Sequence, residues 1–134
     1  MYERHYGFSE KPFEIAPDPK FLFLNSNYRE LLASLIYGVT ERKGLIALVG
    51  EVGTGKTLML NALKERLDAS VKVATIVNPD LTFRQMLNMI LADLDLSRGS
   101  KTISVENGLQ RLQHFTKEQF ESSGNVVVIV DEAQ

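Results

Sequence analysis

Gly50-Glu51-Val52-Gly53-Thr54-Gly55-Lys56-Thr57 directly follows the apolar run Leu45-Ile46-Ala47-Leu48-Val49. The eight residues match the phosphate-loop pattern G-x-x-x-x-G-K-[ST] at every fixed position. The glycines let several backbone N–H groups approach phosphate oxygens, and a helix expected to begin near Lys56 adds unpaired N–H groups. A glycine-rich turn is the alternative interpretation, but a strand before the loop and a helix after it favour a nucleoside-triphosphate site.

Two residues of this loop carry side-chain chemistry. Lys56 is expected to reach the β- and γ-phosphates and to act in catalysis, and the hydroxyl of Thr57 is expected to ligate Mg²⁺. The loop residues expected to contact the nucleotide are Gly50, Glu51, Val52, Gly53, Thr54, Gly55, Lys56, Thr57 and Leu58.

A second apolar run, Val126–Val130, ends in Asp131 and Glu132. It is β-branched throughout and does not alternate, which predicts a strand buried on both faces of a parallel sheet. A carboxylate at the end of such a strand points into the crevice where ligands bind, as in a Walker B segment. Asp131 would then hold Mg²⁺ through its water shell, and Glu132 would orient or deprotonate the attacking water. A solvated turn is the alternative, and the phosphate loop upstream favours the Walker B interpretation.

Composition excludes several other classes of protein. The chain has 134 residues, 44% hydrophobic and 24% charged, with a net charge of −2 and no cysteine. These values predict one soluble globular unit without disulfides or a thiolate metal site, and a nucleotide site favours the cytoplasm. No apolar run approaches the ~18 residues of a transmembrane helix, and the N-terminus lacks the plan of a signal peptide. The sequence shows no cluster of Lys and Arg, so it gives no positive reason to expect nucleic-acid binding.

Strand and helix patterns alternate along the chain. This order predicts an α/β fold with a parallel, doubly wound sheet and right-handed crossovers. The expected elements are a helix capped by Asn27 and ended by Gly44, a strand at 45–49, a helix from 56, a strand at 73–77, a helix at 83–94, a helix at 105–121 and a strand at 126–130. Phe83, Leu109 and Phe120 are expected on the apolar faces of their helices.

The N-terminal part of the chain has a different character. Three prolines lie among aromatic residues between Phe8 and Leu24, which favours an extended segment over a helix. We therefore divide the chain into an extended segment at 1–27 that packs on the core, and a core at 28–134.

A combination of short sequence words resembles one protein family. The words are His5-Tyr6-Gly7-Phe8, Lys11-Pro12-Phe13, Pro17-Asp18-Pro19, Tyr37-Gly38-Val39, Glu41-Arg42-Lys43-Gly44, the phosphate loop and Asp131-Glu132-Ala133-Gln134. Together they are similar to the ExeA-like, general secretion pathway protein A-type AAA+ ATPases. The resemblance spans the whole chain. It departs from the family at Tyr28, where a histidine is usual, and at Leu58, where a second threonine is usual.

The resemblance implies a P-loop NTPase domain of three α/β/α layers that hydrolyses ATP with Mg²⁺. Hydrolysis would drive conformational change in a ring or in a complex with a secretion or envelope partner. It also implies that the chain before the first helix lies against the adenine, so Phe23, Leu24 and Tyr28 are hypothesised base contacts. The open alternative is that these side chains only pack against the sheet and the first helix.

The family also implies further elements after the Walker B strand. A sensor residue, an arginine finger and a helical lid come after that strand in the family, so we expect this chain to be the first half of a domain in a longer protein. Alone, it is expected to bind nucleotide without turning it over. The family's strand order, 5-1-4-3-2, places a further strand between 45–49 and 126–130. Without that strand, we expect 45–49 to pair abnormally, either with 126–130 or with another copy of the chain.

Three functional classes fit these observations. The first is the ATPase core of a motor or assembly factor for secretion or the cell envelope, cytoplasmic and attached to the inner membrane through a later segment. The second is an AAA+ ATPase of a transposition or DNA-targeting complex. The third is a nucleotide-binding module without turnover. A transmembrane or peptidoglycan-binding segment after residue 134 would favour the first class, and a basic DNA-binding segment the second.

Overall fold

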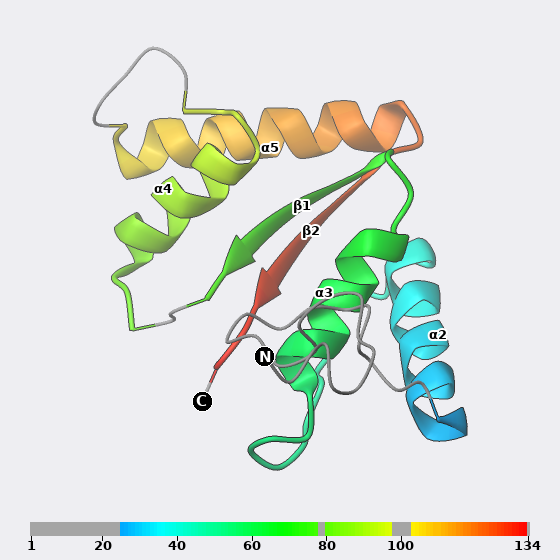
Figure 1. The fold of residues 1–134 in the computed structure, drawn as a ribbon. Coiled ribbons are helices and arrows are strands. Elements are labelled where there is room, and N and C mark those ends of the chain that lie inside the picture. The colour runs from blue at the N-terminus through cyan, green and yellow to red at the C-terminus, as the bar shows by residue number, and fades with distance from the viewer. Residues whose placement is uncertain (1–24, 78–79, 98–102, 134) are drawn as a thin grey trace, which may run out of the picture.

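The computed structural model describes residues 25–77, 80–97 and 103–133. In chain order its elements are α2 (Ser26–Thr40), α3 (Lys56–Arg66), β1 (Val71–Ile76), α4 (Phe83–Asp93), α5 (Val105–Glu121) and β2 (Asn125–Val130), as Figure 1 shows. Leu24 and the rest of the proline-containing segment lie outside the described residues. No helix in the described part is both long and apolar enough to span a membrane.

The two strands form a parallel pair. Val71 is opposite Asn125 and Ile76 is opposite Val130, so the strands are in register along their whole length. In Figure 1, α4 and α5 lie on one side of the pair and α2 and α3 on the other. The predicted class of parallel strands joined through helices is therefore confirmed for this part of the chain. A larger sheet in three full layers stays a prediction.

The run at 45–49 does not form the strand predicted from its composition. Leu45 and Val49 are 90% and 89% exposed, and the sheet of the described residues contains only β1 and β2. The predicted pairing of 45–49 with 126–130 is therefore wrong, whereas pairing with another copy stays a prediction. An extended segment needs a hydrogen-bonded neighbour to become a strand, and no described segment provides one here.

A groove separates this segment from β2. Its volume is about 860 Å³, and it is lined by residues 44–50 and 125–133 and by apolar side chains of α2 and α3. The prediction that 126–130 is buried on both faces is wrong, since Val128 and Val130 are both exposed and only Ile129 of the five is buried. A strand becomes buried on both faces only where helices and neighbouring strands cover it.

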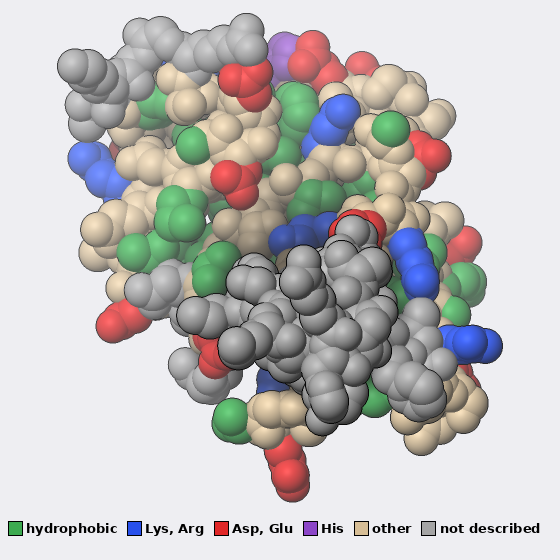
Figure 2. All heavy atoms as spheres, viewed as in Figure 1, with side chains coloured by type: hydrophobic (Ala, Val, Ile, Leu, Met, Phe, Trp, Pro, Cys, Tyr) green, Lys and Arg blue, Asp and Glu red, His purple; other side chains and the backbone are tan. Residues whose placement is uncertain are grey.

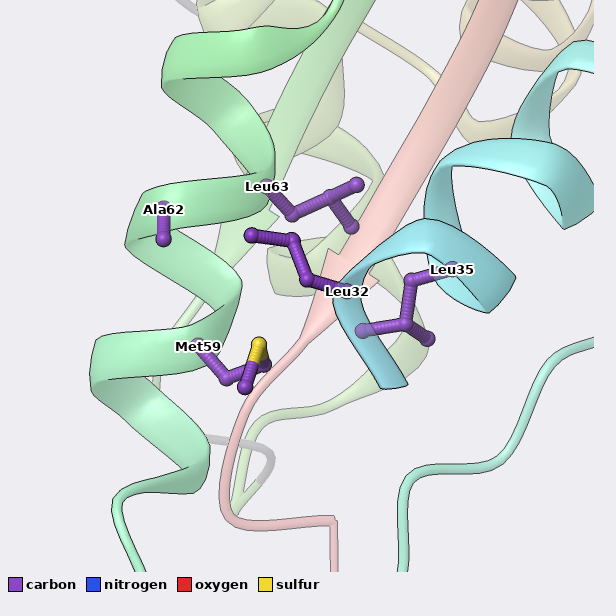
Figure 3. Close-up of a cluster of buried hydrophobic side chains, with 5 residues drawn as sticks. All are labelled: Leu32, Leu35, Met59, Ala62 and Leu63. Carbon is purple, nitrogen blue, oxygen red and sulfur yellow. The ribbon is translucent and has the colours of Figure 1, made fainter. Parts of the chain in front are cut away.

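Two apolar clusters hold the helices together. The first joins α2 to α3 through the side chains in Figure 3, which are Leu32, Leu35, Met59, Ala62 and Leu63. The second contains Leu87 and Leu91 of α4 with Ile103. Gly108 of α5 permits the close packing of α4 and α5, because a Cβ there would lie 3.0 Å from side-chain carbons of Leu87 and Leu91. The first cluster fixes the helix that comes after the phosphate loop.

The helix ends follow local hydrogen bonding. The N-cap of α2 is Asn25 rather than Asn27: Asn25 Oδ1 accepts a hydrogen bond from the backbone N–H of Tyr28 at 2.9 Å. Asn25 is the cap because its side-chain oxygen reaches a first-turn N–H that has no partner within the helix, which is the geometry of an N-cap. The bounds predicted for the last helix, 105–121, are confirmed by α5.

Three aromatic or aliphatic side chains expected to face inward are exposed. Phe83, Leu109 and Phe120 all lie on the surface of their helices, so those predictions are wrong. Helical spacing places them beside the apolar stripe but does not supply an element to cover them. The guanidinium carbon of Arg42 lies over the Phe120 ring, 4.6 Å from the ring centre. Arg42 Nη2 also donates a hydrogen bond to the carbonyl of Gly124 at 2.8 Å. This contact ties the end of α2 to the start of β2.

Candidate nucleotide-binding site

The phosphate loop runs into the first turn of α3 as the sequence predicts. Gly55 is the N-cap of α3 with φ 84°, and Gly53 has φ 80°. Both values lie in the left-handed region that is costly for residues with a Cβ. The first turn of α3 therefore presents its unpaired N–H groups beside a loop whose backbone is free to curve.

Lys56 bends back over this loop. Its Nζ donates to the carbonyl oxygens of Gly50 at 2.8 Å and Glu51 at 2.7 Å. The hydroxyl of Thr54 donates to the same Glu51 carbonyl at 2.8 Å. The ammonium group is thus held beside the loop backbone, where phosphate oxygens could replace the carbonyls as its acceptors.

Thr57 and Asp131 meet although 74 positions separate them in the sequence. The hydroxyl of Thr57 donates to Asp131 Oδ2 at 2.7 Å, and Asp131 is 9% exposed. Asp131 is fixed further because its backbone N–H donates to the carbonyl of Ile76 at 2.9 Å. One hydroxyl and one carboxylate are oxygen ligands of the kind that Mg²⁺ takes from proteins, so the donor set fits that ion. No group of three or more His, Cys, Asp or Glu suited to a metal occurs in the described residues.

Glu132 comes directly after Asp131 and has an unusual backbone. It has φ 56°, its side chain is exposed, and its N–H donates to Asp131 Oδ1 at 2.9 Å. A non-glycine residue at positive φ costs free energy, so the surrounding contacts must hold it there. Nothing in the sequence signalled this conformation.

A cavity of about 270 Å³ lies between α2 and the loop. It is lined by Asn27, Tyr28, Leu31, Leu48, Val49, Gly50, Thr54, Gly55, Lys56 and Met59. Tyr28, a hypothesised base contact, is among them, and its Oη donates to the carbonyl of Thr54 at 2.6 Å. Phe23 and Leu24 lie outside the described residues. The structure thus brings Tyr28 together with the loop.

The remaining predicted contact residues of the loop differ in how far their side chains are exposed. The side chain of Val52 is 98% exposed, and Glu51 is exposed beside it. Leu58 is half-buried in the first turn of α3. Leu31 and Met59 line the cavity without having been predicted there. Both follow the apolar pattern of their helices, so the sequence could have indicated that they are inward-facing but not that they border a cavity.

Charged side chains do not gather on the visible face of the molecule. Figure 2 shows acidic and basic side chains interspersed over that face, rather than one basic patch. Proteins that bind nucleic acid through the backbone phosphates carry a clustered basic surface, which this face does not present.

Comparison with known proteins gives two matches. Residues 39–134 match the family model described as "AAA domain". The whole chain is 36% identical over 134 residues to General secretion pathway protein A of Aeromonas hydrophila. The chain spans 24% of the length of that relative. No solved structure was found to match.

Proposed function

Because this chain belongs to the AAA domain family, we propose that it binds ATP with Mg²⁺ at the phosphate loop and forms part of an ATP-hydrolysing site. It is an AAA-type ATPase domain related to a secretion pathway protein. The observation that carries the proposal is the 2.7 Å hydrogen bond from Thr57 to Asp131, which joins the loop helix to the end of β2. A phosphate loop with an adjacent carboxylate at a strand end is the arrangement that nucleotide hydrolysis requires.

The residues of the loop would bind the triphosphate. Backbone N–H groups from Gly53 to Thr57 and the positive end of α3 would face the phosphates, and Lys56 would exchange the two loop carbonyls for phosphate oxygens. Thr57 and Asp131 would hold Mg²⁺. When bound, this ion neutralises charge on the phosphates.

Glu132 is proposed to act on the attacking water. Its carboxylate comes directly after the residue proposed to hold the ion, which makes it a candidate general base for that water. Glu132 is therefore assigned to hydrolysis, and not to binding.

The biological role is proposed from the relative. The name of that protein places it in a general secretion pathway, and this chain is 36% identical to it. We propose a cytoplasmic ATPase domain that assembles with further copies and acts on a secretion or cell-envelope partner. Because the chain spans 24% of the relative, this role concerns the complete protein.

Titration of the full 134-residue chain with Mg²⁺ and ATP by calorimetry tests the proposed site. Lys56→Ala should abolish binding at concentrations that saturate the wild type, because the ammonium that pairs with phosphate is lost. Lys117→Ala is the matched control, since Lys117 is an exposed lysine of α5. Equal binding by the wild type and Lys56→Ala, or no binding by the wild type, would overturn the proposal.

A further inference from the structure

Tyr28 is held firmly at both ends. It is the third residue of α2, and its backbone N–H donates to the capping oxygen of Asn25 at 2.9 Å. Its partly buried ring packs against the apolar cluster between α2 and α3. A side chain fixed at its backbone and along its ring loses little further entropy when its hydroxyl makes a directed contact.

Tyr28 contacts the phosphate loop between two glycines that have positive φ angles. Its Oη donates to the carbonyl oxygen of Thr54 at 2.6 Å, across 26 residues of sequence. Thr54 stands between Gly53 and Gly55, whose φ angles are 80° and 84°. Because glycines rotate with little steric restriction, an anchor on the carbonyl between them limits how the loop can turn.

The anchor also orients the next amide. In a trans peptide the C=O and N–H groups point in opposite directions, and the described residues contain no cis peptide. The carbonyl of Thr54 points at Tyr28, so the N–H of Gly55 in the same peptide unit points away from it. Gly55 is the N-cap of α3, where N–H groups are available to an anion.

Resting on the proposed function, we propose that Tyr28 is a positioning residue for the triphosphate. Its hydroxyl holds the Thr54–Gly55 peptide so that the Gly55 N–H is presented to phosphate. Tyr28 thereby couples α2 to the phosphate loop. In this role the Tyr28 hydroxyl affects the binding of the phosphates. In a base contact, by contrast, the Tyr28 ring would touch the adenine.

Two ligands separate these roles in the full chain. Mg²⁺ with ATP carries both base and triphosphate, whereas Mg²⁺ with inorganic tripolyphosphate carries no base. Tyr28→Phe keeps the ring and removes the hydroxyl, so the ligand must itself order the Thr54–Gly55 peptide, and the dissociation constants of both ligands should rise by about fivefold. Tyr37→Phe is the matched control, an exposed tyrosine of the same helix, and should bind both ligands as the wild type does.

Two further measurements exclude a purely structural role. The thermal midpoint of Tyr28→Phe without ligand should fall by no more than about 5 °C, the effect of one lost hydrogen bond, because the ring packing is retained. In amide NMR spectra, tripolyphosphate should shift the Gly55 signal of the wild type and shift it less in Tyr28→Phe. The Gly108 signal, from α5, should not move in either protein.

The outcomes are distinct. Unchanged affinity for both ligands in Tyr28→Phe would overturn the positioning role, as would weakening for ATP alone, which would assign the hydroxyl to the base. A large fall in the thermal midpoint would also overturn it, by showing that the hydroxyl serves the fold. Failure of the wild type to bind either ligand would instead refute the proposed function.

Discussion

The hydroxyl of Thr57 donates a hydrogen bond to Oδ2 of Asp131 at 2.7 Å, although the two residues lie 74 positions apart. Thr57 is in the first turn of α3, and Asp131 comes directly after β2. The contact therefore joins α3 to the end of β2. Little else packs between these two elements, because the groove lies between them. It places the two proposed ligands of the metal ion side by side.

Paired substitutions at this contact should separate stability from Mg²⁺ dependence. Thr57→Val removes the donor to Oδ2 of the nearly buried Asp131 carboxylate, and we expect the free energy of unfolding to fall by about 1–2 kcal/mol. Asp131→Asn keeps a hydrogen-bonding partner for Thr57 but removes the charge, so stability should change less while Mg²⁺ no longer strengthens ATP binding. Urea unfolding and calorimetry with Mg²⁺ or EDTA measure the two effects. Asp131→Asn with an unchanged response to Mg²⁺ would contradict the assignment.

Gly55→Ala should weaken both the fold and the site. Its φ of 84° disfavours a Cβ although nothing lies within 4 Å, so the cost is backbone strain of about 1–2 kcal/mol. Gly44→Ala is a closely matched control, since Gly44 has φ 82° and an equally open surrounding. We expect similar losses in thermal stability from both substitutions. Only Gly55→Ala should weaken ATP binding, and equal binding by the two variants would show that the loop conformation does not matter.

Glu132→Gln should separate binding from hydrolysis in the complete protein. The amide cannot accept a proton, so turnover should fall by about 10²–10⁴-fold, while the dissociation constant of ATP stays close to that of the wild type. Phosphate release and equilibrium binding measure the two quantities. Glu121→Gln, at an exposed glutamate of α5, serves as the control. Hydrolysis that persists in Glu132→Gln would remove this residue from the mechanism.

The segment at 45–49 should drive self-association of the 134-residue chain. Leu45 and Val49 are almost fully exposed, and the groove beside them leaves an apolar edge of β2 without a strand partner in the described residues. Exposed apolar edges of this kind pair with other chains. Light scattering during size exclusion should show mass increasing with concentration. Leu45→Lys should suppress the increase and Ala69→Lys, at an exposed turn, should not. A wild-type chain that stays monomeric would refute the expectation.

Local patterns predicted much of this structure. Strand and helix types at β1, α3, α4, α5 and β2 follow from apolar spacing. The start of α3 at Lys56 follows from the glycines before it. Prediction failed wherever the answer depended on a distant covering element. Leu45–Val49 has the composition of a buried strand, but composition cannot supply the neighbour whose backbone would pair with it. Phe120 has helical spacing, yet it is exposed and its ring faces the guanidinium of Arg42.

By itself, the sequence determined that the chain carries a phosphate loop, because its chemistry lies in eight consecutive residues whose backbone freedom and side chains are local properties. Only the tertiary structure decided which residues meet across the fold. Thr57 contacts Asp131, and Tyr28 contacts the carbonyl of Thr54. Such contacts depend on how α2, α3 and β2 are packed. Packing is set by the summed burial of many side chains, and so it cannot be inferred from any single motif.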